Sequence, residues 1–343
     1  MGLAPRRAAP RVLFLTSNVE DYLSDSLFHG LRTVLGEAVL DFPKKEILYR
    51  TYPHVARLYG RGFTLYGLLE DPALDRQLSM DRARQGDFDL VVFGDIWRTF
   101  GSLLELLPSL VRDHTAFVDG ADHAAPYPYS PALWRVRQWW TLPRAHIRGT
   151  YFKRELSART VQYRYSLPIP SGIAGRLPFA RAIRPIAFSI PEEKIVEVPP
   201  KKEQQFPTHV VDSEVAARIG AQPAYAFQSE SDYYADLRAS RFGVTTKRGG
   251  WDCLRHYELA ASGCVLCFRD LDRKPRRCAP HGLQDGGNCL GYRDADELFR
   301  KISALTDAEY TRLQAGSLEW ARMNTTRRRA QEFLRAMGLG AQA

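Results

Sequence analysis

The sequence predicts an α/β protein built from two Rossmann-like, doubly wound domains that face a central cleft. Two observations lead to this fold class. Short apolar runs alternate with helical stretches in both halves of the chain, as in parallel βαβ units. A proline-dense stretch, residues 166–207, separates the two alternating series. The chain has 343 residues, 45% of them hydrophobic, which is enough material for two cores.

The amino-terminal half contains the first alternating series. Ser24 is expected to cap a helix over residues 25–36, and a helix over residues 102–112 is expected to kink at Pro108. Residues 52–85 and 126–148 have no clear period, and the former could be a helical excursion or a flap over the active site. Strands are predicted over residues 11–17, 38–42, 89–95 and 115–119.

The carboxyl-terminal half repeats the alternation and ends in a long helical tail, residues 307–337. The predicted strands are residues 209–211, 224–227, 242–245, 264–268 and 289–292, and the predicted helices are residues 213–219, 231–240, 251–262 and 294–305. The expected organisation is a disordered leader (1–10), an amino-terminal domain (11–184), a carboxyl-terminal domain (185–335) and a tail (336–343).

Charge and composition narrow the class of protein. The net charge of +9 suits a phosphate-rich ligand, but the basic residues are spread along the chain, which favours solvated faces over a nucleic-acid groove. No apolar run is long enough to span a membrane, and the start lacks an apolar signal core, so we expect a cytoplasmic protein. Cys264 and Cys267 lie three apart in an apolar strand and point to opposite faces, so we expect buried free thiols and no metal site.

The segment 243–263 contains the residues that are expected to bind an anionic ligand. It combines a strand, the basic glycine turn Lys247-Arg248-Gly249-Gly250, and a helix that is expected to begin near Gly250. Glycines let the backbone approach a ligand closely, and the free amides at a helix start favour an anion. Lys247 and Arg248 add positive charge at the same place. We therefore expect a diphosphate site formed by these two side chains and the amides from Gly249 to Trp251.

Glu258 and Arg255 lie one turn apart on the predicted helix. One interpretation is an ion pair on a solvated helix face, which contributes only about a few tenths of a kcal/mol. The other is that Glu258 accepts hydrogen bonds from the hydroxyls of a ribose while the glycine loop holds the diphosphate. A purely structural helix does not need the glycine loop, which favours the second interpretation.

A family resemblance rests on these residues. The segment RHYELAASGCV (255–265) resembles the donor-binding segment of GT-B-type glycosyltransferases, and most closely that of the bacterial spore-maturation-protein-like glycosyltransferases. Asn288, shortly before LGYRDADEL (290–298), also resembles that family. The resemblance covers about residues 225–335, and the amino-terminal half is similar only in architecture.

The resemblance implies that the carboxyl-terminal domain binds a nucleotide diphosphate sugar and that the amino-terminal domain binds the acceptor. Glu258 would contact the ribose, and Lys247 and Arg248 would meet the phosphates, without a cofactor. Many retaining enzymes of this fold have a second glutamate eight residues before this one, but here that position is Gly250. The resemblance therefore carries no statement about stereochemistry.

The amino-terminal half offers weaker candidates at the expected carboxyl ends of its strands. Asp119, Asp122 and His123 are candidates for a general base that acts on the acceptor hydroxyl, although the same residues also suit an ordinary polar turn. Lys153 and Arg154 are more typical of a solvated strand end than of a phosphate site. The Trp-rich stretch 134–140, with Tyr127 and Tyr129, could stack on an acceptor or fill a core.

These features together predict a glycosyltransferase that moves a sugar from a nucleotide diphosphate sugar to the hydroxyl of an acceptor: a glycan, a small molecule or another hydroxyl compound. A sugar-nucleotide epimerase of the same fold would share the donor site and need no acceptor. A nonenzymatic module that binds nucleic acid or another polyanion through its basic surface is the alternative from a different class.

Overall fold

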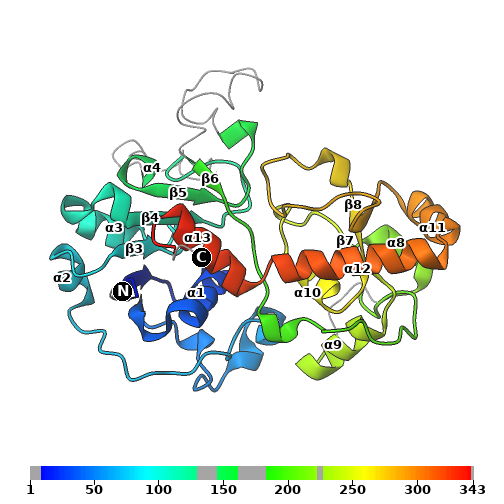
Figure 1. The fold of residues 1–343 in the computed structure, drawn as a ribbon, viewed down its shortest axis with the longest axis horizontal. Coiled ribbons are helices and arrows are strands. Elements are labelled where there is room, and N and C mark those ends of the chain that lie inside the picture. Colours follow the sequence, from blue (N-terminus) through cyan, green and yellow to red (C-terminus); the bar gives the residue numbers. More distant parts are fainter. Residues whose placement is uncertain (1–8, 130–144, 161–182, 222–226, 341–343) are drawn as a thin grey trace, which may run out of the picture.

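The computed structural model describes residues 9–129, 145–160, 183–221 and 227–340. Figure 1 shows two α/β domains side by side, one built around strands β1–β6 and the other around β7–β9. Both sheets are parallel throughout and both carry helices on their two faces. The predicted fold class, two doubly wound domains of the GT-B type, is confirmed.

The amino-terminal sheet has the strand order β2-β1-β3-β4-β5-β6. The order reverses between β1 and β3, and in open sheets of this kind ligands bind beyond the carboxyl ends of the strands at such a point. β6 falls inside the proline-dense stretch and was not predicted, because its three residues give no readable alternation. The strands are β1 (Val12–Leu15), β2 (Val39–Phe42), β3 (Leu90–Phe93), β4 (Thr115–Asp119), β5 (Thr150–Lys153) and β6 (Ile183–Pro185).

The helices of this domain differ from the prediction at their ends. Helix α1 begins three residues before the predicted start, because the Asp21 carboxylate, and not Ser24, accepts a hydrogen bond from a first-turn amide, that of Ser24, at 2.8 Å. Helix α3 stops short of Pro108, and a 3-10 turn continues to Ser109. The helices are α1 (Tyr22–Leu35), α2 (Ser79–Arg84), α3 (Phe100–Leu106) and α4 (Ala145–Arg148).

The carboxyl-terminal sheet has the order β7-β8-β9 among the described residues, with β7 (Phe242–Thr245), β8 (Val265–Arg269) and β9 (Cys289–Tyr292). Residues 209–211, predicted as a strand, contain only a bridge at His209, and most of the predicted strand 224–227 lies outside the described residues. The helices are α8 (Ser213–Ile219), α9 (Glu230–Ala239), α10 (Leu254–Ala261), α11 (Ala295–Ala304), α12 (Asp307–Met323) and α13 (Thr326–Ala336).

The predicted helical tail is two helices with different partners. Thr325 caps α13 and accepts a hydrogen bond from the Arg328 amide, so the helix axis breaks after Asn324. α12 packs on α10 in the carboxyl-terminal domain, whereas α13 packs on α1 in the amino-terminal domain, as Figure 1 shows. The chain therefore crosses between the domains twice, and the two crossings are hydrogen-bonded through Ile190, Asn324 and Thr326.

Alternating side chains connect the sheets to the packing between the domains. Phe14 of β1 and Leu266 of β8 belong to one continuous core that extends across both domains. Their neighbours Leu13 and Val265 face the outer helical layers, each in a separate cluster. This alternation with period two is what a sheet covered on both faces requires. The shared core holds the two domains against each other and defines the walls of the cleft.

Candidate functional site

A cavity of about 600 Å³ lies between the domains. The predicted donor residues Arg248, Gly249, Gly250, Arg255 and Glu258 all line it. Its further lining residues come from both domains and include Tyr22, Tyr59, Phe63, Asp122, Arg154, Phe188, Tyr233, Asp252 and Cys253. Residues that are far apart in the sequence thus meet at the predicted diphosphate loop.

The loop between β7 and α10 is longer than predicted. The helix begins at Leu254 and not near Gly250, with Cys253 in extended conformation as its N-cap. The open amides of the first turn are therefore those that follow Cys253, several residues beyond the glycines. The amides of Trp251 and Asp252 both point at one carboxylate oxygen, Glu155 Oε1, at 2.9 and 3.4 Å. An anionic group thus already occupies this part of the loop.

Buried side chains hold the loop in place. His256 Nε2 lies 3.0 Å from the Trp251 carbonyl, so it carries the proton, and Nδ1 then accepts from the Thr245 hydroxyl at 2.8 Å. Burial lowers the pKa of His256 to about 4, so the ring stays neutral. The Asp252 carboxylate accepts from the Tyr257 hydroxyl and from the Phe188 amide. These contacts tie the loop to its own helix and to the interdomain crossing.

The two glycines lie against carboxylate side chains of the other domain. A Cβ atom on Gly249 would lie 2.2 Å from Oδ2 of Asp122, and one on Gly250 would lie 2.4 Å from Oε1 of Glu155. The sequence predicted a close approach of a ligand to this backbone. In the structure, two carboxylates of the amino-terminal domain make that approach.

Glu258 lies inside the cleft and not on a solvated helix face. Its side chain is 7% exposed, which excludes the interpretation as a surface ion pair. Oε1 accepts a hydrogen bond from the Thr64 hydroxyl of the amino-terminal domain, and Oε2 accepts from the Tyr233 hydroxyl. The Arg255 guanidinium lies over the Tyr233 ring, 5.7 Å from its centroid. The carboxylate thus receives one hydroxyl on each oxygen.

Arg154 is a residue of the site whose burial the sequence did not indicate. It was expected at a solvated strand end, but it is 1% exposed and lines the cavity. Its guanidinium donates to the carbonyls of Gly120 and Asp252 and pairs with Asp122. Lys153 is also buried, at 0% exposure. The prediction of a solvated strand end is therefore wrong, because the end of β5 lies under the other domain.

The predicted bases of the amino-terminal domain separate into two groups. Asp122 lines the cavity, with its side chain 62% exposed. Asp119 is 0% exposed and not among the lining residues; its carboxylate accepts from Trp97 Nε1, the Tyr151 hydroxyl and Lys153 Nζ. His123 packs edge-on against Trp97, and burial lowers its pKa. Of the three, Asp122 is the one placed to meet a ligand.

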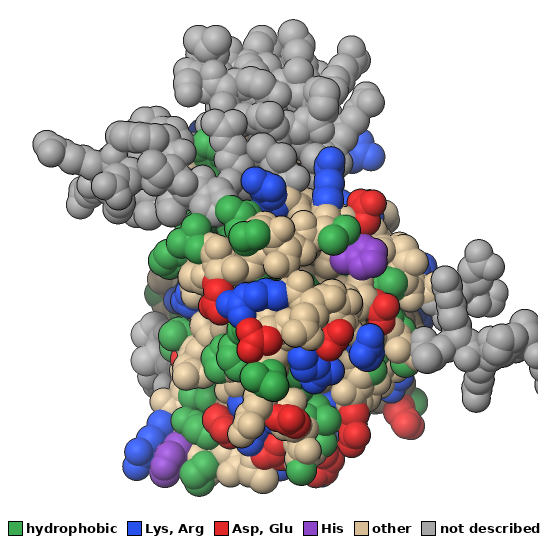
Figure 2. Space-filling view, turned by 90° about the vertical axis from the view of Figure 1, so that its left-hand side faces the viewer, with side chains coloured by type: hydrophobic (Ala, Val, Ile, Leu, Met, Phe, Trp, Pro, Cys, Tyr) green, Lys and Arg blue, Asp and Glu red, His purple; other side chains and the backbone are tan. Residues whose placement is uncertain are grey.

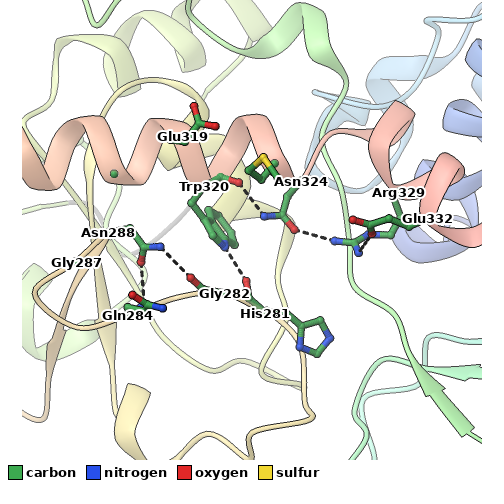
Figure 3. Close-up of a pocket in the computed structure, with 12 residues that line it drawn as sticks. His281, Gly282, Gln284, Gly287, Asn288, Glu319, Trp320, Asn324, Arg329 and Glu332 are labelled. Carbon is green, nitrogen blue, oxygen red and sulfur yellow. Dashed lines mark hydrogen bonds and ion pairs between the residues drawn. The ribbon is translucent and has the colours of Figure 1, made fainter. Parts of the chain in front are cut away.

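Asn288, Lys247 and Trp251 are not among the residues that line the interdomain cavity. Figure 3 shows Asn288 in a different pocket of about 570 Å³, between α12 and the loop before β9. Its amide accepts from the Gln284 backbone and donates to the Gly282 carbonyl, so it closes the loop internally. Lys247 is exposed and lies over the ring of Trp251, 5.3 Å from its centroid. The Trp-rich stretch 134–140 lies outside the described residues.

The cavity carries groups of both signs. Arg248, Arg154 and the first turn of α10 offer positive potential, and Glu258, Asp122 and Asp252 offer carboxylate oxygens. Among the described residues no group of histidine, cysteine or acidic side chains is arranged to hold a metal ion, and no helix is long and apolar enough to cross a membrane.

Comparison with known proteins supports the fold. No protein-family model and no curated protein matches the sequence. Among solved structures, Alr3699/HepE of Anabaena in complex with UDP and glucose is similar with a TM-score of 0.55 at 11% identity, over 96% of this chain and 99% of that one. A glycosyltransferase of Rickettsia africae gives 0.55 at 9% identity, over 98% and 100%.

A third solved structure extends the likeness. WaaG, a glycosyltransferase of lipopolysaccharide biosynthesis, has a TM-score of 0.50 at 10% identity and covers 97% of this chain and 100% of that one. The similarity extends over nearly the full length of all three proteins. The chain thus has the two-domain fold of these three proteins.

Proposed function

We propose that the protein is a glycosyltransferase that binds a nucleotide diphosphate sugar in the interdomain cavity and transfers the sugar to an acceptor hydroxyl. The observation that carries the proposal is the convergence of Arg248, the glycine pair and Glu258 on one cavity at the carboxyl end of β7. The cavity is lined by arginines that can pair with phosphates and by a carboxylate, Glu258, that can accept from the hydroxyls of a ribose. The full-length likeness to two solved glycosyltransferases supports this assignment.

Each group has a defined task in the proposed reaction. Arg248 and the amides that open α10 stabilise the charge that develops on the diphosphate as the glycosidic bond breaks. Glu258 accepts hydrogen bonds from the ribose hydroxyls and fixes the donor relative to the loop. Asp122 is the proposed base for the acceptor hydroxyl, because it is the acidic group of the predicted trio that lines the cavity. Closure of the domains excludes water from the reacting atoms.

The polyanion-binding alternative requires a continuous basic surface. The face of the molecule in Figure 2 shows lysine and arginine side chains interspersed with acidic ones. Many of the exposed basic groups are also paired, such as Arg84 with Glu105 and Arg218 with Asp296. Such a surface offers little gain in counterion release on binding a polyanion. The charge distribution therefore supports a local anion site over a general polyanion surface.

A thermal-shift screen of nucleoside diphosphates and their sugars, beginning with UDP and UDP-glucose, tests the proposal. A ligand that binds the folded state raises the melting temperature according to its concentration and affinity. Glu258→Gln is expected to reduce the shift strongly, and the control Lys201→Ala, an exposed lysine outside the cavity, is expected to retain it.

Two outcomes contradict the proposal. One is that no nucleoside diphosphate or nucleotide sugar shifts the melting temperature. The other is that Glu258→Gln and Lys201→Ala behave alike. For a ligand that does bind, radiolabelled donor with and without acceptors distinguishes transfer from isomerisation of the donor sugar.

A further inference from the structure

A segment of the amino-terminal domain, residues 58–67, reaches across the cleft to the carboxylate assigned to the donor. Thr64 is its central residue and is 1% exposed. Its amide donates to Glu230 Oε1 at 2.6 Å and its hydroxyl contacts Glu258, both in the carboxyl-terminal domain. Phe63 stacks on Tyr233, with the ring centroids 5.9 Å apart, and Arg61 donates to Gln228. One short segment thus makes several polar and aromatic contacts with the opposite domain.

The direction of the hydrogen bonds at Thr64 follows from the groups involved. Thr64 Oγ1 has one proton and lies between Glu258 Oε1 and the Tyr234 hydroxyl, which is 2.8 Å away. Burial raises the pKa of Tyr234 well above its ordinary value, so this phenol is a donor. Tyr234 therefore donates to Thr64, and Thr64 donates to Glu258. The carboxylate receives a full hydroxyl hydrogen bond from the other domain.

The backbone at Thr64 is held in an unfavourable conformation. Its φ is +78°, a value that β-branched residues rarely adopt. Glycines with positive φ lie on both sides, at Gly60, Gly62 and Gly67. A Cβ atom on Gly62 would lie 2.5 Å from a side-chain carbon of Val55, so the turn depends on that glycine. Strain of this kind is typical of ligand clamps and switch segments.

We propose that the Thr64 hydroxyl occupies the position on Glu258 that a ribose hydroxyl of the nucleotide sugar takes, and that Thr64 is displaced when the nucleotide binds. This inference rests on the proposed function. A ribose offers two neighbouring hydroxyls, and Glu258 already receives two, one on each oxygen. Both partners are 1% exposed, and Tyr233 lines the cavity whereas Thr64 is not among its lining residues. Tyr233 belongs to the same domain as Glu258, whereas Thr64 belongs to the opposite domain, so a movement between the domains separates Thr64 from Glu258 and leaves Tyr233 in place. Thr64 is therefore the partner that a nucleotide can replace.

The segment thereby links donor binding to the contact between the domains. Tyr59, Gly60 and Phe63 line the cavity directly, so a ligand that reaches Glu258 Oε1 must move this segment. Moving the segment costs free energy, and this cost weakens the binding of a nucleotide. A diphosphate without a ribose does not need to move the segment, so its binding is not weakened. Thr64 is a positioning residue that sets how tightly the ribose half of the donor is held.

Isothermal titration calorimetry on Thr64→Val tests the proposal. Valine keeps the branched shape and removes the hydroxyl. The probes are inorganic pyrophosphate, which has no ribose, and the nucleoside diphosphate among UDP, GDP, ADP, CDP and dTDP that stabilises the wild type most. The dissociation constant for the nucleoside diphosphate is expected to fall about tenfold, because a competing hydrogen bond to a charged group is gone. The dissociation constant for pyrophosphate is expected to be unchanged.

Two further variants keep the result interpretable. Thr64→Ser retains the hydroxyl and is expected to bind both probes as the wild type does. Thr64→Gly removes the hydroxyl and relieves the positive φ, so it replaces Thr64→Val as the test if that variant does not fold.

The outcomes separate this inference from the proposed function. Nucleoside diphosphate binding that is unchanged or weaker in Thr64→Val or Thr64→Gly overturns the inference while leaving the donor site intact. Tightening of both probes to the same degree also overturns it, because the effect is then not at the ribose end. Absence of nucleoside diphosphate binding in the wild type overturns the proposed function and the inference with it.

Discussion

Each wall of the cleft carries a lysine followed by an arginine, but the two pairs differ in their burial. On the carboxyl-terminal wall Lys247 and Arg248 are exposed, on a loop whose backbone faces the cavity. On the amino-terminal wall Lys153 and Arg154 are buried and paired with Asp119 and Asp122. An exposed cation can exchange its solvent for a ligand, whereas a buried cation must keep its partner. Burial, and not residue type, therefore distinguishes the two pairs of cations.

Removal of a buried charge should have the largest effect on stability. Lys153→Met leaves the Asp119 carboxylate without its ammonium partner at 0% exposure, so we expect a loss of about 3–5 kcal/mol in the free energy of unfolding. Lys247→Met, on the other wall, should change it by less than about 1 kcal/mol, the contribution of an exposed cation over an aromatic ring. Urea denaturation measures both. Equal losses would show that the two walls do not differ in this way.

The acidic residues of the amino-terminal wall offer a second contrast. Asp122→Asn should lower kcat about 100-fold or more, as removal of a general base does. It should lower stability less than Asp119→Asn does, because Asp122 is 62% exposed and Arg154 keeps Glu155 and the carbonyls of Gly120 and Asp252 as partners. Asp119→Asn should chiefly lower stability, because the carboxylate accepts from Trp97, Tyr151 and Lys153. Steady-state kinetics and thermal unfolding on both variants provide the test. An Asp122→Asn enzyme with unchanged kcat would exclude Asp122 as the base.

The basic loop should show a smaller, graded effect. Arg248→Ala should weaken pyrophosphate binding about tenfold, since Arg248 lines the cavity and can contact two phosphate oxygens. Lys247→Ala should weaken it less, about twofold, because Lys247 acts from outside the cavity as a screened charge. Calorimetric titration with pyrophosphate compares the two. The reverse order would place the diphosphate on the outer side of the loop.

A dependence of stability on pH is expected to arise at Asp95. Burial, followed by the nearby Asp21 carboxylate, raises the pKa of Asp95 to about 7, and Arg98 opposes this with a contact of 3.0 Å. The folded state therefore holds a proton that the unfolded chain loses near pH 4, which stabilises the fold at low pH.

This stabilisation is complete below about pH 4 and is lost as the pH rises through about 7. Relative to Asp95→Asn, the wild type should lose stability over that interval. Urea denaturation of both proteins across the interval measures the difference. A constant difference would show that Asp95 has the same pKa in both states.

The sequence by itself determined the α/β class and the elements whose pattern is local. β4, β7 and β9 begin and end where their apolar runs do, and the basic glycine loop lies directly after β7 as predicted. Alternation of side chains and the special backbone freedom of glycine are properties of neighbouring residues, so a single sequence displays them. The start of α10 was less readable, because its N-cap is Cys253, a residue type that does not mark helix starts.

Only the tertiary structure decided which residues share the site. Thr64 meets Glu258 across 194 positions of sequence, and Arg154 meets the Asp252 carbonyl across 98. Asn288 lies in the same half of the sequence as the glycine loop, yet it closes a different loop beside α12. Such pairings depend on how two domains pack, and no local periodicity records them. The sequence thus predicted the cavity residues that one loop and one helix contribute, while the packing of the domains brought Thr64, Arg154 and Glu155 to them.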